Sequence, residues 1–460
     1  MPPSRISTMR PKRGGRLSQL TTPRIPGARP RVVIVGGGFA GINAARALGK
    51  LPVDLTVIDR RNHHIFQPLL YQVALAVLSP ADIAQPIRGI LARHQNTQVL
   101  MDEVTGIDTA ARTLTLASGA SIGYDYLLLA TGATHSYFGH DEWAKFAPGL
   151  KSIEDATEIR RRVLLAFELA ERQMQEHGWH PPLNFVIIGA GPTGVELAGA
   201  IGDISQYYLQ HDFRHIDPRK SRVLLLDGGD RILATYPPQL STRAAEELAA
   251  RSVEVHTKSH VTGVGPGWVE ANGQRTEAAV ILWAAGVQAS PLGKLLGAAT
   301  DKRGCVLVDN ELNPPGLETT FVLGDLAHFE QNGRQIPGVA QPAIQMGNHA
   351  AKMIAADLEG KPRPPFHYFD KGDMATIGRL AAVADVKWPF TALMSGWTAW
   401  FAWLTVHIFF LIGFRNRLAV MWSWIWNYLT FSDSARLITG DQTLPGWKEQ
   451  TEEGKKAAGS

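Results

Sequence analysis

Two observations predict an α/β protein made of two similar halves. A G-x-G-x-x-G pattern occurs at residues 36–41 and again at residues 189–194, and each pattern directly follows an apolar, strand-like run, at residues 31–35 and 184–188. In such a turn the first glycine makes the bend and the second lets the backbone approach a pyrophosphate. The third glycine lets the following helix pack against the strand. The predicted fold class is therefore α/β with two Rossmann-like dinucleotide-binding domains.

The first half contains the further elements that such a domain needs. A helix is expected at residues 42–48, and a second strand at residues 54–58 leads into Asp59. Asp59 follows Gly36 at close to the spacing of about 20 residues typical of a carboxylate that binds ribose hydroxyls. A buried strand is expected at residues 124–129, and the small residues 130–133 that follow it let the backbone approach a ligand.

The second half repeats this design. A helix at residues 153–175 is expected to cross over into it, and a strand at residues 223–226 ends in Asp227. A strand at residues 279–283 then leads into the small residues 284–286, like the segment after the third strand of the first half. A last strand is expected at residues 320–325, and its final acid, Asp325, lies at the edge where ligands bind in such sheets.

Composition limits the chemistry. The chain has 460 residues, of which 45% are apolar and 19% charged, as expected for a globular protein of two or three domains. Cys305 is the single cysteine, which excludes an internal disulfide, a Cys-x-x-Cys redox pair and a thiolate metal cluster. His63 and His64 lack the spaced partners of a metal site, so no metal is predicted and a hydrogen-bonded turn is expected there. Redox chemistry would have to come from a bound cofactor.

The net charge of +4 is unevenly distributed. Residues 1–30 contain seven cations and no acid, so the rest of the chain is slightly acidic. No apolar run of the length of a secretory signal occurs there. We interpret residues 1–30 as a disordered basic tail, either touching anionic lipid or simply solvated, with a transit peptide as a third alternative. A second disordered tail is expected at residues 446–460.

The order of these motifs resembles that of the two-dinucleotide-binding flavoprotein reductases, which have a glutathione-reductase-like fold. The resemblance covers residues 31–380 and implies non-covalent FAD at the first glycine turn and NADH at the second, with Asp325 bonded to the ribityl chain of FAD. The FAD-binding residues it implies are Gly36, Gly38, Phe39, Ala40, Gly41, Asp59, Arg60, Gln67, Thr131, Gly132, Gly324, Asp325, Ala340 and Gln341. The NADH-binding residues are Gly189, Gly191, Pro192, Thr193, Gly194, Glu196, Asp227, Ala285 and Gly286.

Further segments narrow the resemblance. Residues 62–74 occupy the region where disulfide reductases of this superfamily carry redox cysteines, and none occurs here. Residues 340–345 are similar to the Ala-Gln-x-Ala-x-Gln quinone-site motif of type II NADH:quinone oxidoreductases, and residues 371–379 and 413–417 also resemble that family. This resemblance implies a non-proton-pumping respiratory enzyme that transfers a hydride from NADH to FAD and then reduces a membrane quinone by two electrons.

Four residues are expected to act in that reaction. The resemblance places Glu196 where nicotinamide meets flavin; the alternative is an acid that stabilises the first turn of a helix. Gln341 and Gln345 lie four apart, hence on one face of a helix or turn, and their amides can donate to and accept from a quinone carbonyl. Two glutamines at this spacing alone would more often be surface residues, but the whole motif favours the quinone site. Lys371 is expected to pair with flavin or quinone as charge builds up, with a solvated lysine as the alternative. Asp227 favours NADH, while Arg231 four positions on keeps NADPH as a minor alternative.

Residues 393–431 differ in character from the rest. They hold no acid and six of the 12 tryptophans, and residues 397–414 form an uncharged run of 18 residues. Leu418, Trp422, Ile425 and Leu429 are spaced along one face of an expected helix. A transmembrane hairpin and a buried helix pair are alternatives; we favour amphipathic helices lying in the membrane surface. The chain is thus expected to be a peripheral, monotopic protein on the cytoplasmic face of the bacterial inner membrane and a homodimer, with no nucleic-acid partner.

The expected domains follow from these assignments: a tail at 1–30, an FAD-binding domain at 31–155 and 290–385, an NADH-binding domain at 156–289, membrane-associating helices at 386–445 and a tail at 446–460. Other functions stay open. A reductase for ferredoxin or rubredoxin-like partners would need no aromatic C-terminal segment. Sulfide:quinone oxidoreductase needs catalytic cysteines that Cys305 alone does not supply. A non-enzymatic flavoprotein that signals through NADH-dependent dimerisation is the most distant alternative.

Overall fold

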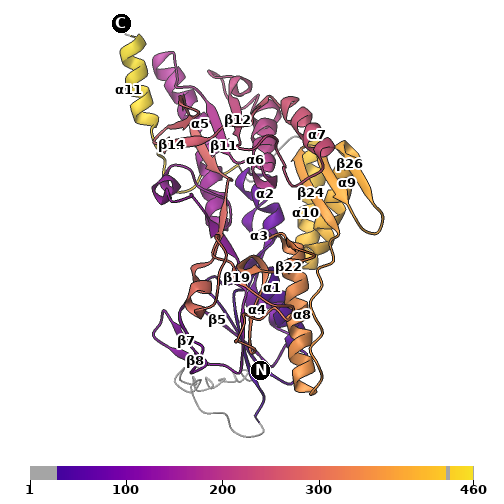
Figure 1. Ribbon diagram of the computed structural model, residues 1–460. Coiled ribbons are helices and arrows are strands. Elements are labelled where there is room, and N and C mark those ends of the chain that lie inside the picture. The colour runs from indigo at the N-terminus through magenta and orange to yellow at the C-terminus, as the bar shows by residue number, and fades with distance from the viewer. Residues whose placement is uncertain (1–27, 431–435, 459–460) are drawn as a thin grey trace, which may run out of the picture. The chain divides into compact units, whose positions relative to one another are not determined.

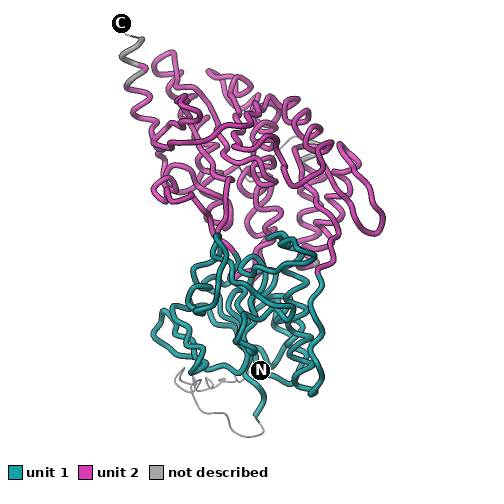
Figure 2. The backbone as a smooth tube through the Cα atoms, in the orientation of Figure 1, with its two compact units in different colours: residues 1–62, 87–132, 289–367 teal, residues 63–86, 133–288, 368–460 magenta. Residues whose placement is uncertain are grey.

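The computed structural model describes residues 28–430 and 436–458, so most of the expected basic tail lies outside the described residues. The chain forms two compact units, which Figure 2 shows in different colours. Unit 1 comprises residues 1–62, 87–132 and 289–367, and unit 2 comprises residues 63–86, 133–288 and 368–460. Residues 63–86, 133–155 and 368–385, which the sequence assigns to an FAD-binding domain, fall in unit 2. Which ligand each unit binds stays a prediction.

Unit 1 is built on a parallel five-stranded sheet (Figure 1). Its central strand is buried from Val32 to Val35, because an interior parallel strand is covered on both faces. The strands lie in the order β20 (Thr320–Val322), β9 (Tyr126–Leu129), β1 (Arg31–Val35), β2 (Asp54–Asp59) and β5 (Thr97–Met101). The predicted strands are confirmed, although β9 begins at Tyr126 rather than at residue 124, and β20 ends at Val322 rather than at residue 325.

Two helices of unit 1 pack closely against each other. Helix α1 (Phe39–Leu48) begins inside the glycine turn, three residues before the predicted start, and α8 (Ala340–Leu358) contains the glutamine motif. The smaller elements of unit 1 are α4 (Ile87–Leu91), β6 (Val104–Asp108), β7 (Thr113–Leu116), β8 (Ser121–Gly123), η6 (Pro291–Leu296), β19 (Val306–Leu307), η7 (Gly324–Leu326), β21 (Ala327–His328), β22 (Glu330–Gln331) and β23 (Arg334–Gln335).

Unit 2 repeats the motif with a four-stranded parallel sheet. Its strands lie in the order β13 (Val253–His256), β12 (Arg222–Leu226), β11 (Asn184–Ile188) and β17 (Val280–Trp283). Helices α6 (Pro192–Asp203) and α7 (Pro238–Ala249) belong to this unit. The sheet confirms the predicted second half, and its first three strands in the sequence, β11, β12 and β13, are hydrogen-bonded in chain order.

A long helix, α5 (Ile153–His177), leads into this sheet as predicted. It begins where Ser152 Oγ accepts from the amide of Asp155 at 3.1 Å, while the Asp155 carboxylate accepts from the amide of Ser152 at 2.9 Å. It ends at Gly178, whose φ of +72° suits only glycine well. The smaller elements of unit 2 are β3 (His63–Ile65), η2 (Gln67–Leu69), α2 (Leu70–Ala74), α3 (Pro80–Ile83), β4 (Ala84–Pro86), β10 (Ala133–His135), η3 (Asp141–Lys145), η4 (Ile204–Tyr208), η5 (Pro218–Lys220), β14 (Val261–Gly265), β15 (Trp268–Ala271), β16 (Gln274–Glu277) and β18 (Val287–Ala289), which ends at the boundary with unit 1. His63 and His64 lie in strand β3, not in a turn.

The C-terminal part of unit 2 is an antiparallel sheet with two helices beside it (Figure 1). The sheet consists of β24 (Gly372–Gly378), β25 (Ala381–Val386) and β26 (Ala392–Ser395). Helix α9 (Gly396–Phe410) packs on β25, and α10 (Phe414–Thr430) follows after a break at Gly413, where φ is +94°. Because of this break, the uncharged run of 18 residues is not one helix. In the described part of the chain, no helix combines the length and apolar character needed to cross a bilayer.

The end of the chain departs from the prediction. The expected disordered tail is wrong for residues 447–458, which form helix α11 (Trp447–Ala458). The Trp447 side chain is buried, and Gln450 Nε2 donates to the carbonyl of Gly267 at 2.6 Å. The buried Trp447 ring and the buried hydrogen bond from the Gln450 side chain therefore hold α11 in place, although its other side chains are mostly polar.

Candidate active site

In the glycine turn of unit 1, the first and third glycines of the motif, Gly36 and Gly41, have no room for side chains. Gly36 has a φ of +105°, and a Cβ atom on it would lie 2.4 Å from the carbonyl oxygen of Ala130. A Cβ on Gly41 would lie 1.8 Å from the carbonyl oxygen of Gly36. Gly38 is exposed and is the N-cap of α1, so the free amides of the first helical turn lie beside bare backbone. This is the geometry that receives a pyrophosphate.

Asp59 ties this turn to the second strand. Its Oδ2 accepts from the amide of Gly37 at 2.6 Å and its Oδ1 from the amide of Arg61 at 2.7 Å. Thr131, at the end of β9, has a buried Oγ1 for which the described residues offer no hydrogen-bond partner. Both features fit a bound dinucleotide such as FAD. The bare backbone of the turn leaves room for the pyrophosphate, and the buried Oγ1 of Thr131 can hydrogen-bond to a polar group of the ligand.

Two further segments of unit 1 meet the same end of α1. Gly324, with a φ of +67°, would place a Cβ 3.3 Å from Cβ of Ala343 and 3.6 Å from Cβ of Ala40. Its neighbour Asp325 lies in η7 and is partly buried. The start of α8 thus joins the turn, and Gln341 and Gln345, both partly buried, lie in its first two turns as the spacing predicted.

Gly347, which lets α8 contact α1, was not predicted from the sequence. A Cβ on Gly347, in α8, would lie 2.2 Å from the carbonyl oxygen of Ala40, so α8 crosses α1 at backbone contact. A glycine inside a helix costs about 1 kcal/mol relative to alanine, which is the signal that such a residue has a packing role. Gly37 was also missed, although its amide holds Asp59.

The glycine turn of unit 2 has nearly the same backbone geometry. Gly189 has a φ of +101° and would place a Cβ 2.5 Å from Cα of Ala285, and a Cβ on Gly194 would lie 1.8 Å from the carbonyl oxygen of Gly189. Gly191 is the N-cap of α6 and has open space where its Cβ would be. Pro192 is exposed, and Thr193 and Gly286 are partly buried. A dinucleotide fits here as well.

The acid after β12 favours one of the two nicotinamide cofactors. Asp227 Oδ2 accepts from the amide of Ala190 at 2.6 Å and Oδ1 from the amide of Gly229 at 2.7 Å, so its carboxylate faces the turn. Arg231 donates instead to the carbonyls of Tyr236 and Ala234, at 2.7 and 2.6 Å. A guanidinium held by two carbonyls is a poor candidate for a 2′-phosphate site.

Glu196 occupies a low-polarity position in unit 2. It is the fifth residue of α6, so the alternative of a stabilising first-turn acid is wrong. Burial raises its pKa to about 8, although a backbone hydrogen bond from Thr376 opposes the shift. Helix α6 is pressed on β24 here, since a Cβ on Gly199 would lie 1.6 Å from the carbonyl oxygen of Ile377. A carboxyl group with this pKa can hold or release a proton near neutral pH.

Further acidic groups lie near Glu196. Asp373 and Asp385 are directly opposite each other on β24 and β25, and burial followed by the charge of Asp370 raises the pKa of Asp373. The buried Tyr236 interacts with Asp373 and Glu196, and its pKa is raised chiefly by burial. Lys371, just before β24, is partly buried.

The structure brings together most of the predicted residues within each unit. In unit 1 these are the glycine turn, Asp59, Thr131, Gly324, Asp325 and the start of α8. Arg60 is exposed, and Gln67 belongs to unit 2, where its amide lies 3.5 Å from the carbonyl of Lys151. No group of three or more metal-ligating side chains lies together among the residues described.

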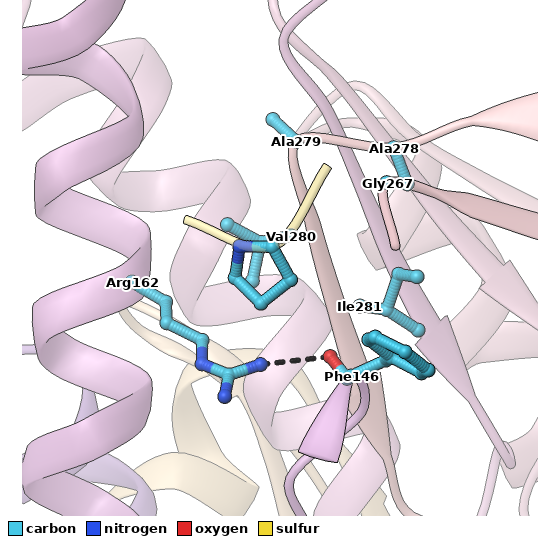
Figure 3. A pocket seen from close by; sticks show the side chains of 8 residues that line it. Phe146, Arg162, Gly267, Ala278, Ala279, Val280 and Ile281 are labelled. Carbon is cyan, nitrogen blue, oxygen red and sulfur yellow. Dashed lines mark hydrogen bonds between the residues drawn. The ribbon is translucent and has the colours of Figure 1, made fainter. Parts of the chain in front are cut away.

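A small cavity lies apart from these residues (Figure 3). It is within unit 2, and Arg162 donates to the carbonyl of Phe146 at 2.8 Å on its wall. Its volume is about 10 Å³, room for about one water molecule. None of the predicted site residues lines it, so it is a packing defect and not a substrate site.

Helices α9 and α10 expose large apolar side chains. Trp397 is 69% exposed and Trp422 66%, whereas Trp403 and Trp424 are buried. Trp424 Nε1 donates to the side chain of Gln72 at 2.7 Å, which fixes α10 to unit 2. Leu418, Trp422 and Ile425 share an exposed face as predicted; the side chain of Leu429 lies outside those described. The other exposed apolar residues of the two helices are Phe401, Val406, Phe409, Phe410, Met421 and Trp426.

Comparisons with known proteins agree with this geometry. The family model described as "Pyridine nucleotide-disulphide oxidoreductase" matches residues 30–347, and "NDH2 C-terminal domain" matches residues 371–431. The chain is 42% identical over 434 residues to the type II NADH:quinone oxidoreductase Ndh of Mycobacterium tuberculosis, covering 91% of this chain and 92% of that protein. It is 44% identical over 420 residues to NdhA of the same organism, covering 87% and 88%.

A solved structure extends the likeness to the fold. NDH2 of Plasmodium falciparum in complex with NADH superposes with a TM-score of 0.79, covering 90% of this chain and 100% of that chain at 18% identity. At this identity the likeness concerns the fold alone. The sequence matches above span both glycine turns and the C-terminal helices. The chain therefore belongs to the type II NADH:quinone oxidoreductases of the pyridine nucleotide-disulphide oxidoreductase family.

Proposed function

We propose that this protein is a non-proton-pumping respiratory NADH:quinone oxidoreductase that contains FAD. The balanced reaction is NADH + H⁺ + quinone → NAD⁺ + quinol. The observation that carries the proposal is the pair of glycine turns, one in each unit, whose first and third glycines have no room for a side chain, in a chain 42% identical to a type II NADH:quinone oxidoreductase over 91% of its length. Bound FAD would supply the two-electron redox chemistry that links oxidation of NADH to reduction of the quinone.

Unit 1 is proposed to hold FAD without a covalent bond. The amides at the start of α1 would bind the pyrophosphate, and Asp59 would bind ribose hydroxyls. Asp325 would bind the ribityl chain, with Thr131, Gly132 and Ala340 lining the site. Gln341 and Gln345 would bind the quinone carbonyl, since both lie on one side of α8 near its start. The partly buried state of both glutamines supports a role other than plain solvation.

Unit 2 is proposed to hold NADH. The start of α6 would bind its pyrophosphate, Asp227 its adenosine ribose and Ala285 and Gly286 its nicotinamide half. Glu196 would hold a proton, because burial raises its pKa to about 8. The engaged guanidinium of Arg231 supports NADH over NADPH.

The exposed apolar side chains of α9 and α10 are proposed to lie in a lipid surface, on the cytoplasmic face of the bacterial inner membrane. Tryptophan is favoured at the level of lipid head groups, and a hydrophobic quinone has to enter from the bilayer. Part of the same apolar surface is proposed to be buried in a homodimer. Sedimentation of the detergent-solubilised protein tests the dimer, and flotation with anionic vesicles tests lipid binding.

A steady-state assay of the flavin-loaded protein tests the reaction. NADH, NADPH and a water-soluble quinone analogue are compared, and NADH oxidation is expected to match quinone reduction one to one. Purified protein without flavin absorbance, or quinone reduction with NADPH alone, would contradict the proposal. Faster reduction of a ferredoxin-type protein than of quinone would favour the soluble-acceptor reductase instead.

A further inference from the structure

Two aromatic rings enclose the ammonium group of Lys371. Its Nζ lies 5.7 Å from the ring centroid of Trp388 and 5.7 Å from that of Phe410. Trp388 follows β25, and Phe410 is the last residue of α9, so the two rings come from different elements of unit 2. Both distances are within the range of about 6 Å at which a ring face attracts a cation.

The rings also belong to the apolar surface of the C-terminal region. Trp388 is 54% exposed and Phe410 38%, and Phe369 packs edge-on against Trp388 with ring centroids 6.2 Å apart. Exposed aromatic rings with this support keep their inner faces toward Lys371 and their outer faces toward the surroundings. Lys371 therefore lies just beneath the surface that we propose contacts lipid.

A neighbouring lysine has the opposite environment. Lys387 Nζ lies 2.7 Å from Asp370 Oδ2 and 3.8 Å from Asp385 Oδ2, and the hydrogen bond that it donates to Asp370 is the main cause of its raised pKa. For Lys371, the described part of the chain offers no carboxylate within ion-pair distance. Lys387 is neutralised by acids, whereas the ammonium of Lys371 lies against two rings and, among the residues described, has no carboxylate beside it, so its charge stays available to a negatively charged ligand.

We propose that Trp388 and Phe410 are positioning residues that hold the cation of Lys371 for reduction of the quinone. The inference rests on the proposed function and deepens it. A quinone gains two electrons and two protons on its way to quinol, and negative charge builds on its oxygens before both protons have arrived. A cation held without a carboxylate partner stabilises that charge more than a solvated lysine does, because the rings exclude water without neutralising it.

The arrangement of Lys371 between Trp388 and Phe410 is called the clamp below. A double-mutant cycle tests it in flavin-loaded, full-length protein. Trp388→Ala is expected to lower kcat for quinone reduction roughly three- to tenfold, the size of a lost cation–π contact. Trp388→Phe keeps a ring and is expected to recover most of that loss. In a Lys371→Met background, Trp388→Ala is expected to cause little further loss, because the group that it positions is gone. Phe410→Leu provides a second, milder probe of the same contact.

Two matched controls separate the clamp from the rest of the surface. Phe390→Ala removes a similarly exposed aromatic ring two residues from Trp388, and Lys387→Met removes the acid-paired lysine; neither is expected to change kcat more than about twofold. Flavin content, melting temperature and stopped-flow flavin reduction by NADH are expected to stay at wild-type values in Trp388→Ala.

The outcomes distinguish the two proposals. Losses that multiply independently in the double variant, or an equal loss in Phe390→Ala, would overturn the clamp. A Trp388→Phe variant as slow as Trp388→Ala would also overturn it. Wild-type protein that fails to couple NADH oxidation to quinone reduction would overturn the proposed function itself, whatever the variants do.

Discussion

The two glycine turns share a backbone but differ in what covers them. In both, the third glycine would clash at 1.8 Å with the carbonyl of the first, and a carboxylate after the second strand accepts from the amide of the turn's second residue at 2.6 Å. In unit 1, however, α8 crosses the helix that follows the turn at backbone contact through Gly347, and Gly324 closes in beside it. In unit 2 the close backbone contact of α6 lies further along, between Gly199 and Ile377 of β24, so we call this turn the open one; the middle glycine, Gly38 or Gly191, has free space in both turns.

The difference suggests how one motif serves two purposes. A turn closed by a second helix is suited to a ligand that stays bound through many reaction cycles, because release would require packed backbone to separate. An open turn is suited to a ligand that must leave after each cycle. The enclosed turn is the proposed FAD site and the open one the proposed NADH site, which matches a resident cofactor and an exchanging substrate.

The largest effect should come from alanine at the third glycine of each turn. Gly41→Ala pushes a methyl group into the carbonyl of Gly36, and we expect more than a tenfold loss of bound flavin, measured by the ratio of flavin to protein absorbance. Gly194→Ala makes the same clash in unit 2, and we expect normal flavin content with NADH binding almost abolished. Flavin loss in both variants would break the comparison, since it would make the two turns equivalent.

The acids after the second strands should give a smaller contrast. Asp227→Asn weakens the bonds to the amides of Ala190 and Gly229 and the proposed bond to ribose, so the KM for NADH should rise about tenfold. Asp59→Asn should leave that KM unchanged and speed flavin release during gel filtration. Stopped-flow titration with NADH measures the first effect and flavin fluorescence in the flow-through the second. Identical behaviour of the two variants would contradict the assignment of one ligand to each unit.

How far the sequence predicted the molecule depends on the range of the interactions. The glycine turns, the strands behind them and Asp59 and Asp227 follow a local pattern, because a tight turn demands glycine wherever it occurs. The backbone contact of Gly347 with Ala40 joins residues some 300 positions apart, and no local pattern encodes it. The α11 helix was missed for the same reason: its mostly polar sequence is held by Trp447 and by the bond from Gln450 to Gly267. The raised pKa of Glu196 likewise depends on burial that only the fold supplies.

Glu196, in the helix that follows the open turn, should make the stability of the protein moderately dependent on pH. Its pKa rises from 4.5 to about 8 in the folded protein, so between these values the folded state binds more protons than the unfolded state. Stability should therefore fall as pH rises from about 5 to about 8, by about 1–3 kcal/mol since the side chain is only partly buried. Urea unfolding of wild type and Glu196→Gln at pH 5.5, 7 and 8.5 measures this, and the variant should lack the decline. The same slope in both proteins would place the titrating group elsewhere.

Arg231→Ala should have the smallest effect, and it tests the open turn most finely. The guanidinium donates to the carbonyls of Ala234 and Tyr236, so it supports the loop after Asp227 rather than a ligand. Loss of these two hydrogen bonds, one part-buried and one exposed, should lower the free energy of unfolding by about 1 kcal/mol. The melting temperature should then fall by a few degrees at most. The ratio of kcat/KM for NADH to that for NADPH should change less than about twofold. A fall of tenfold or more in kcat/KM for NADPH would mean that Arg231 leaves its carbonyls to bind a 2′-phosphate. The open turn would then accept both cofactors.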